Sequence, residues 1–170
     1  MEKMKTLVLV RHGKSDWTFE ELSDIDRPLK ERGVNDSYKM AGRLKKQKII
    51  PDLILSSSAT RAIHSAIIFA RQMGIPASKI VINENLYMAT EKEILEIIKK
   101  TDDSVKTLFV FGHNPIFTIL ANEFVQESID NIPTAGMVIL NFEVETWAEI
   151  KKNRKSSDIF DFPKNLSKYD

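Results

Sequence analysis

Residues 6–10, with the sequence TLVLV, decide the fold. A continuous run of β-branched and leucine residues, without polar alternation, is typical of a strand that is buried on both faces of a parallel sheet. Two similar runs follow at residues 53–55, before a cluster of serines, and at residues 105–111, before a glycine. Residues 137–142 form another. Turn-forming residues end these runs, so the sequence predicts several strands of one buried sheet.

The segments between these strands carry apolar residues at helical spacing. Such stripes occur within residues 34–44, 59–70 and 94–98. A fourth helix is predicted to begin at Pro115, because proline is favoured at the first helical position. Strands that alternate with helices imply right-handed crossovers and a sheet with helices on both faces. The predicted fold class is therefore α/β, as a single three-layer α/β/α sandwich that spans residues 1–170 and has a mostly parallel central sheet.

Composition excludes several classes of function. A chain of 170 residues is long enough for one domain with a real core. Because it contains no cysteine, disulfides, thiolate metal sites and a cysteine nucleophile are excluded. The 25 basic and 24 acidic residues nearly balance, unlike those of a nucleic-acid-binding surface. No stretch approaches the roughly 20 apolar residues that cross a bilayer, so we expect a soluble, cytoplasmic protein that binds neither nucleic acid nor membrane.

Two of the three histidines follow directly on predicted strands. His12 stands after the first strand, next to Arg11, and His113 follows the strand that ends in a glycine. Ligands of such sheets bind beyond the carboxyl ends of the strands, so both imidazoles are expected to face a ligand crevice. The third histidine, His64, lies within a predicted helix and is expected to be structural. The three histidines lack the local spacing of zinc sites, so we expect neither a metal nor a cofactor.

Two helix starts near these strand ends suit an anion. Arg61 lies in the first turn of a predicted helix, where a cation opposes the helix dipole by roughly 0.3–1 kcal/mol. This placement indicates an anionic partner, which is either a bound phosphate or a nearby carboxylate. Asn114 is predicted to cap the helix that follows His113. The free amides of such a helix start bind anions readily, and the histidine adds a further donor.

The roles of several other residues stay open. Ser15 and Asp16 either line the mouth of the expected pocket or cap the turn after the first strand. Residues 151–158, KKNRKSSD, are expected to form a solvated loop before a C-terminal segment. The run 151–155 within it is either a docking site for an acidic partner or, more simply, a solvated face. Four residues are candidates for an apolar rim of the pocket or for ordinary packing: Trp17, Phe19, Tyr87 and Met88.

Together these segments resemble the histidine phosphatase superfamily, which contains phosphoglycerate mutases and many acid phosphatases. Within it they are most similar to short SixA-type phosphohistidine phosphatases. The resemblance covers nearly the whole chain. It is carried by RHGKSDW at residues 11–17, DRPL at 26–29, Arg32 with Gly33, residues 56–62 and GHNP at 112–115.

The resemblance implies a phosphoglycerate mutase-like fold and a role for each motif residue. His12 would be the nucleophile, and Arg11, Arg61 and His113 would bind the transferred phosphoryl group. Superfamily members often use a carboxylic acid after the second helix to protonate the leaving group. Glu84 is the candidate for this acid, with an exposed loop carboxylate as the alternative. Further candidates for substrate binding are Asn114 and Ser15.

The chemistry of these residue types leads to the same mechanism as the resemblance. A neutral His12 imidazole attacks phosphorus, and water then hydrolyses the phosphohistidine that forms. Arginines and helix-terminal amides neutralise the charge of the transition state, so no metal is required. A compact chain without long insertions has little material for a lid around a small sugar phosphate, so we expect an open pocket. An open pocket favours phosphohistidine in a protein, one of signal transduction, as the substrate. The alternatives are a phosphatase of small phosphomonoesters and a module that binds phosphorylated partners without turnover. A mutase is less favoured, because it needs a closed site.

Overall fold

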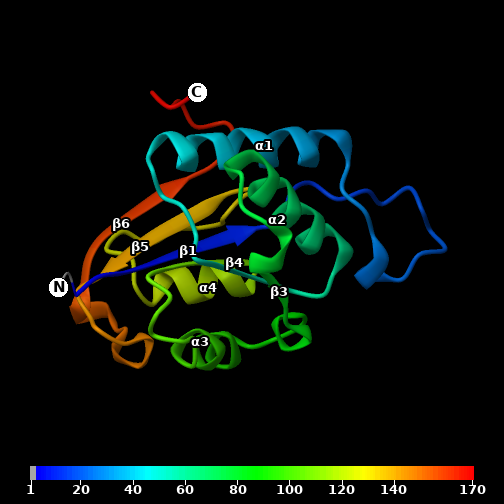
Figure 1. Ribbon diagram of the computed structural model, residues 1–170. Coiled ribbons are helices and arrows are strands. Elements are labelled where there is room, and N and C mark those ends of the chain that lie inside the picture. The colour runs from blue at the N-terminus through cyan, green and yellow to red at the C-terminus, as the bar shows by residue number, and fades with distance from the viewer. Residues whose placement is uncertain (1–2) are drawn as a thin grey trace.

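A six-stranded sheet runs through the molecule in the order β3-β2-β4-β1-β5-β6 (Figure 1). The computed structural model describes residues 3–170. The four strands β1 to β4 run parallel to one another, whereas β5 is antiparallel to β1 and β6 is antiparallel to β5. The strands are β1 (Lys5–Arg11), β2 (Leu53–Ser56), β3 (Ile80–Ile82), β4 (Thr107–Gly112), β5 (Met137–Phe142) and β6 (Lys155–Asp161).

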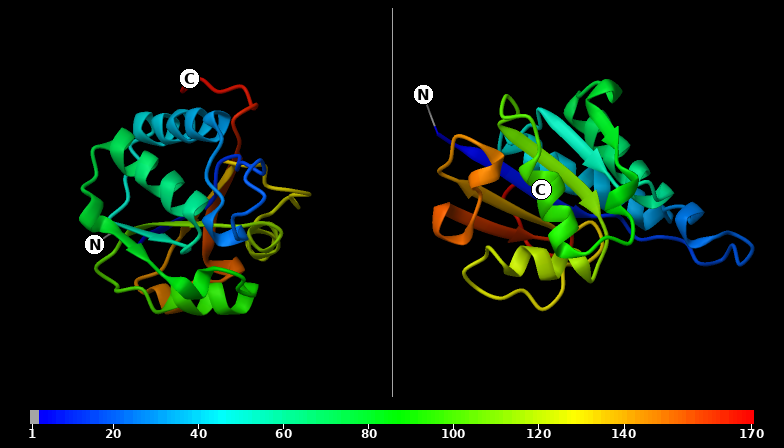
Figure 2. Two further views of the ribbon diagram at one scale, coloured as in Figure 1. Left: turned by 90° about the vertical axis from the view of Figure 1, so that its right-hand side faces the viewer. Right: turned by 90° about the horizontal axis from the view of Figure 1, so that it is seen from below.

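Two helices cover each face of the sheet, with α1 and α2 on one side and α3 and α4 on the other (Figures 1 and 2). The predicted three-layer α/β sandwich with a mostly parallel sheet is therefore confirmed. The helices are α1 (Glu31–Lys46), α2 (Thr60–Met73), α3 (Glu91–Lys99) and α4 (Ile116–Asn122).

Strand β1 contributes to both hydrophobic cores. Val8 and Val10 belong to the cluster that includes α1 and α2, whereas Leu7 and Leu9 belong to the cluster that includes α3 and α4. All four side chains are fully buried. Because alternate residues of a strand point to opposite faces, an unbroken apolar run is needed to fill both cores. This arrangement explains the composition of residues 6–10.

The carboxyl ends of β2, β4 and β1 lie side by side, since these strands are neighbours in the sheet. An irregular segment follows β1 and extends beyond this edge before it turns back into α1 (Figures 1 and 2). Two glycines let the segment pass close to the start of α1. A Cβ atom on Gly13 would lie 2.5 Å from the Gly33 carbonyl oxygen, and one on Gly33 would lie 2.3 Å from the Lys14 carbonyl oxygen. Glycine is therefore required at both positions.

The structure corrects two predictions of local structure. Part of the predicted loop at residues 151–158 forms β6, which the polar sequence concealed because this edge strand pairs on one side only. At the start of α4, Pro115 is the N-cap, and not the first helical residue as predicted. Asn114 lies one position earlier than a cap, yet its Oδ1 accepts hydrogen bonds from the Thr118 amide and hydroxyl. Among residues 3–170, no helix has the length and apolar character to span a bilayer.

Candidate active site

A hollow of about 590 Å³ opens beyond the carboxyl ends of β1, β2 and β4. Arg11 is the last residue of β1, Arg61 lies in the first turn of α2, and His113 follows β4. The hollow thus gathers side chains from three segments that are distant in the sequence. Six of the seven residues predicted for the site line it: Arg11, His12, Ser15, Arg61, His113 and Asn114.

His12 is buried, with 7% of its surface exposed. Its Nδ1 lies 2.7 Å from the Gly13 carbonyl oxygen. A carbonyl oxygen can only accept a hydrogen bond, so Nδ1 carries the proton and Nε2 keeps its lone pair. Arg61 Nε donates to this Nε2 over 3.3 Å. Burial lowers the pKa of His12 to about 3, so the imidazole is neutral at pH 7 and the lone pair of Nε2 is not protonated.

His113 is the second imidazole of the hollow, and its ring centroid lies 5.2 Å from that of His12. The Ser57 hydroxyl lies 2.7 Å from His113 Nε2. The other nitrogen, Nδ1, is buried and has no hydrogen-bond partner in the structure. Burial, followed by the charge of Arg61, lowers the pKa of His113 to about 4. The ring is therefore neutral at pH 7 and can bond to a ligand through Nδ1.

Three arginines bring positive charge to the hollow. Arg11 donates from Nη1 to the Ile132 carbonyl oxygen over 2.8 Å, whereas its buried Nε has no partner. Arg61 is almost fully buried and is engaged by His12 and Asp24. Arg27 lies over the Trp17 ring, with 3.5 Å between the guanidinium carbon and the ring centroid. The unpartnered nitrogens of Arg11 and His113 make this region suited to an oxyanion.

Asp24 and Arg27 also line the hollow, although the sequence did not reveal a role for either. Asp24 accepts hydrogen bonds from the Tyr87 hydroxyl, from Arg61 and from Arg27. The Tyr87 hydrogen bond, and then those of the two arginines, hold the pKa of this carboxyl well below its usual range. Arg27 belongs to the DRPL motif, which could have drawn attention to it. Asp24 begins a short 3-10 turn, Asp24–Asp26, and neither a strand end nor a helix stripe marks it in the sequence.

Glu84, the seventh predicted residue, is exposed and does not line the hollow. It begins a short 3-10 turn, Glu84–Leu86, and lines a separate hollow beyond Tyr87 and Met88. The structure therefore does not bring its carboxylate to His12. His64 lies in α2 and is also outside the hollow.

The structure shows the surroundings of residues whose roles the sequence left open. Ser15 is buried and its hydroxyl accepts a hydrogen bond from Arg27, so it lines the hollow. Asp16 instead caps a turn, because its Oδ1 accepts hydrogen bonds from the Thr18 amide and hydroxyl. Trp17 and Met88 form an exposed rim, with 66% and 86% of their surfaces accessible.

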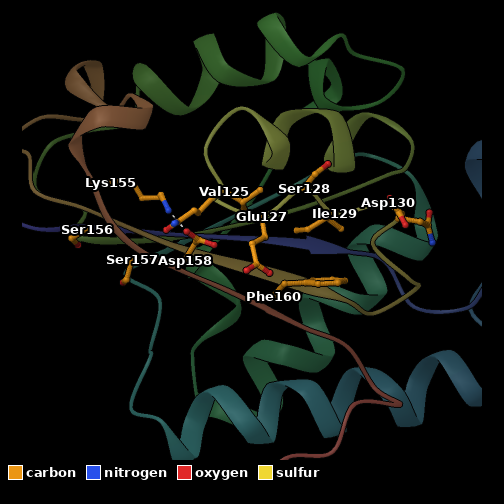
Figure 3. Close-up of a pocket in the computed structure, with 12 residues that line it drawn as sticks. Val125, Glu127, Ser128, Ile129, Asp130, Lys155, Ser156, Ser157, Asp158 and Phe160 are labelled. Carbon is orange, nitrogen blue, oxygen red and sulfur yellow. Dashed lines mark hydrogen bonds and ion pairs between the residues drawn. The ribbon is translucent and has the colours of Figure 1, made fainter.

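A second hollow, of about 750 Å³, lies away from these residues between β6 and residues 125–131 (Figure 3). It contains Glu127, Asp130 and an ion pair of Lys155 with Asp158. Carboxylates predominate there, so this hollow does not suit a phosphoryl group. Within residues 3–170, no three His, Cys, Asp or Glu side chains are grouped so that they could hold a metal ion.

Relatives of known sequence match most of the chain. The family model of the histidine phosphatase superfamily, branch 1, matches residues 7–87. An uncharacterized protein of Mycobacterium tuberculosis is 32% identical over 152 residues, which cover 84% of this chain and 92% of the relative. A 2,3-bisphosphoglycerate-dependent phosphoglycerate mutase of Clavibacter michiganensis is 35% identical over 118 residues, which cover 66% of this chain and 43% of the mutase.

Solved structures of histidine phosphatases are also similar to this chain. A candidate phosphohistidine phosphatase SixA from Agrobacterium tumefaciens is 28% identical, with a TM-score of 0.74, and the match covers 81% of this chain and 92% of that one. The protein histidine phosphatase SixA complexed with tungstate is 21% identical, with a TM-score of 0.74 and coverage of 93% and 97%, and shows likeness of fold. As its motifs predicted, the chain belongs to the histidine phosphatase superfamily and is a phosphatase.

Proposed function

We propose that this phosphatase removes the phosphoryl group from phosphohistidine in proteins, with His12 as the acceptor and without a metal ion. The observation that carries the proposal is the state of His12. The Gly13 carbonyl oxygen fixes the proton on Nδ1, and Arg61 faces the lone pair of Nε2. A neutral imidazole that is held in this tautomer beside buried cations is suited to attack phosphorus.

The reaction would proceed in two displacements at phosphorus. In the first, the Nε2 lone pair of His12 forms a P–N bond while the P–N bond of the substrate breaks. The electron pair of that bond returns to the substrate ring, which is protonated on its other nitrogen and therefore departs as neutral imidazole. In the second, water attacks phosphorus and the bond to Nε2 breaks, which regenerates neutral His12 and releases phosphate. Arg11, Arg61 and His113 Nδ1 would bind the equatorial oxygens of the transferred group. The two arginines would neutralise the negative charge on these oxygens, which metal ions neutralise in other phosphoryl-transfer enzymes.

The leaving group distinguishes the two substrate classes. Among the residues of 3–170 that line the hollow, Asp24 is the only one with a carboxyl group. Because its pKa lies well below the usual range, Asp24 is ionised at neutral pH and cannot donate a proton. An alkoxide leaving group gains much from a general acid, whereas the imidazole nitrogen of phosphohistidine leaves well without one. This difference favours phosphohistidine over an alkyl phosphomonoester.

Two other functions remain as candidates. The sequence identity with a phosphoglycerate mutase favours a small phosphomonoester as the substrate. A module that only binds phosphorylated partners would need the arginines but no nucleophile, so the tautomer of His12 argues against it. Hydrolysis in the presence of excess EDTA separates these candidates. Turnover of alkyl phosphates above that of phosphohistidine would favour the first, and phosphate binding without any turnover would favour the second.

The decisive experiment traps the intermediate. The protein is mixed with a radiolabelled phosphohistidine protein and quenched within one turnover, and the label is located by peptide mapping. We expect the label on His12 in the natural protein and none in His12→Ala. His64→Ala is the matched control, because it removes an imidazole outside the hollow and should still be labelled. Label that persists at the same level in His12→Ala would refute His12 as the acceptor.

A further inference from the structure

The Asp24 carboxylate is surrounded by donors within the hollow. Its Oδ2 accepts hydrogen bonds from Arg61 Nη2 over 3.0 Å and from the Tyr87 hydroxyl over 2.6 Å. Its Oδ1 accepts from Arg27 Nε, also over 3.0 Å, and Arg27 Nη2 lies at the same distance. Asp24 is therefore the anion that three donor side chains share in the free protein.

The contacts of Arg61 show what this carboxylate occupies. Nε and Nη2 lie on one edge of a guanidinium and form its side-on fork. In this structure Nε donates to His12 Nε2 over 3.3 Å, and Nη2 donates to Asp24 over 3.0 Å. The remaining nitrogen, Nη1, donates to the backbone carbonyl oxygen of Asp24 over 2.6 Å. Both nitrogens of this fork are thus already hydrogen-bonded in the free protein, Nε to the His12 imidazole and Nη2 to the Asp24 carboxylate.

A phosphoryl group on His12 Nε2 would need the same fork. Guanidinium groups bind carboxylate and phosphate oxygens in the same bidentate geometry, so the two anions compete for Nη2. The backbone contact at Nη1 does not depend on the carboxylate and keeps Arg61 in place during an exchange. Tyr87 and Arg27 likewise keep Asp24 hydrogen-bonded after it leaves Arg61. Neither buried Arg61 nor Asp24 is then left without a partner.

We propose that Asp24 is a positioning residue that pairs with Arg61 in the free enzyme, yields Arg61 to the phosphoryl group, and reclaims it as phosphate leaves. The proposal rests on the proposed function of the hollow. It makes the Asp24 carboxylate an internal competitor of the product. Without that competitor, phosphate should bind more tightly and leave more slowly.

The test is the affinity of the folded protein for inorganic phosphate, measured by calorimetry, which requires no turnover. We expect Asp24→Asn to bind phosphate about tenfold more tightly than the natural protein, as for the loss of one hydrogen-bonded charged competitor. In turnover assays the same variant should show stronger product inhibition and a lower kcat, with a KM that does not rise. The matched control is Asp26→Asn, in the same turn, whose carboxylate contacts Ser23 and does not line the hollow. It should leave phosphate affinity unchanged.

Equal or weaker phosphate binding by Asp24→Asn would overturn the proposal, because a residue that only supports Arg61 would weaken binding when altered. If this variant does not fold, the natural protein decides the question through a structure with bound tungstate or phosphate. We expect the oxyanion on Arg61 Nη2 and the Asp24 carboxylate beyond hydrogen-bond distance. An intact Asp24–Arg61 pair beside the bound oxyanion would refute the exchange. A natural protein that binds neither anion would instead contradict the proposed function itself.

Discussion

At the scale of single residues, the orientation of His113 depends on one hydroxyl group. Ser57 Oγ is fully buried and lies 2.7 Å from Nε2 of the half-buried His113. Ser57→Ala removes this partner and should lower the single-turnover rate constant by between about twofold and tenfold, since a neutral hydrogen bond contributes about 0.5–1.5 kcal/mol. The measurement is single-turnover hydrolysis of a phosphohistidine protein.

The neighbouring Ser56 provides the control for this prediction. It is equally buried, but its hydroxyl donates to the Ser57 carbonyl oxygen over 2.9 Å and does not contact His113. Ser56→Ala should therefore keep the natural rate. Equal losses in both variants would show that the serine cluster acts through packing and not through His113.

Glu84 gives a second prediction at this scale. Its carboxylate is exposed and lies outside the hollow, so it has no path to a leaving group at His12. Glu84→Gln should change the rate on phosphohistidine by less than about twofold, whereas loss of a general acid costs about 10²-fold or more. The rate on an aryl and an alkyl phosphate is measured in parallel. A hundredfold loss on the alkyl phosphate alone would restore Glu84 as the acid of an ester phosphatase.

At the scale of elements, the start of α1 fixes the turn that carries His12. A Cβ on Gly33 would lie 2.3 Å from the Lys14 carbonyl oxygen, so an alanine must displace backbone. Gly33→Ala should lower the free energy of unfolding by about 1–3 kcal/mol, as overpacking does, and should reduce activity.

Gly42, in the same helix, has a Gln72 side-chain atom at 3.6 Å from its ideal Cβ as nearest neighbour. Gly42→Ala should instead stabilise the protein by about 0.5–1 kcal/mol, with activity unchanged. Urea unfolding measures both, and shifts of the same sign would contradict the prediction.

The strands that the sequence predicted are those that are buried on both faces of the sheet. Residues 6–10 are apolar because two cores require it, and the fully buried centre of β4 is apolar for the same reason. The edge strands β3 and β6 have no such constraint. β3 has three residues, two of them exposed, and β6 mixes lysine, serine and aspartate. Pairing with one neighbour holds these strands, and such pairing leaves little trace in local composition.

The site residues that could be predicted are likewise those whose position in the sequence marks them. Arg11, His12 and His113 were predicted because strand ends mark them, and Arg61 because it stands at a helix start. Asp24 could not be predicted in this way, since tertiary contacts with Arg27, Arg61 and Tyr87 place it.

At the scale of the whole molecule, folding keeps two histidines of the hollow neutral at pH values below 6.5, where they would be charged in the unfolded chain. The folded pKa values of His12 and His113 are about 3 and about 4, against 6.5 for a free imidazole. Between pH 6.5 and about 4 the unfolded chain therefore binds more protons than the folded one, and stability falls as the pH falls. Two such groups give a limiting slope of about 2.7 kcal/mol per pH unit. His64, whose pKa burial also lowers, adds to the slope in the same direction.

Urea unfolding at a series of pH values tests this coupling of site and stability. The lowered pKa values of Asp24 and Glu149 act below their usual values of 3.8 and 4.5, so the histidines dominate the change above about pH 4.5. The variant His12→Gln/His113→Gln should lose most of the slope between pH 6.5 and about 4, and should be more stable than the natural protein near pH 4.5. His64→Gln should keep most of the slope. If the double variant keeps the natural slope, the two imidazoles are not buried in the neutral form, and a neutral His12 could not be the resting nucleophile.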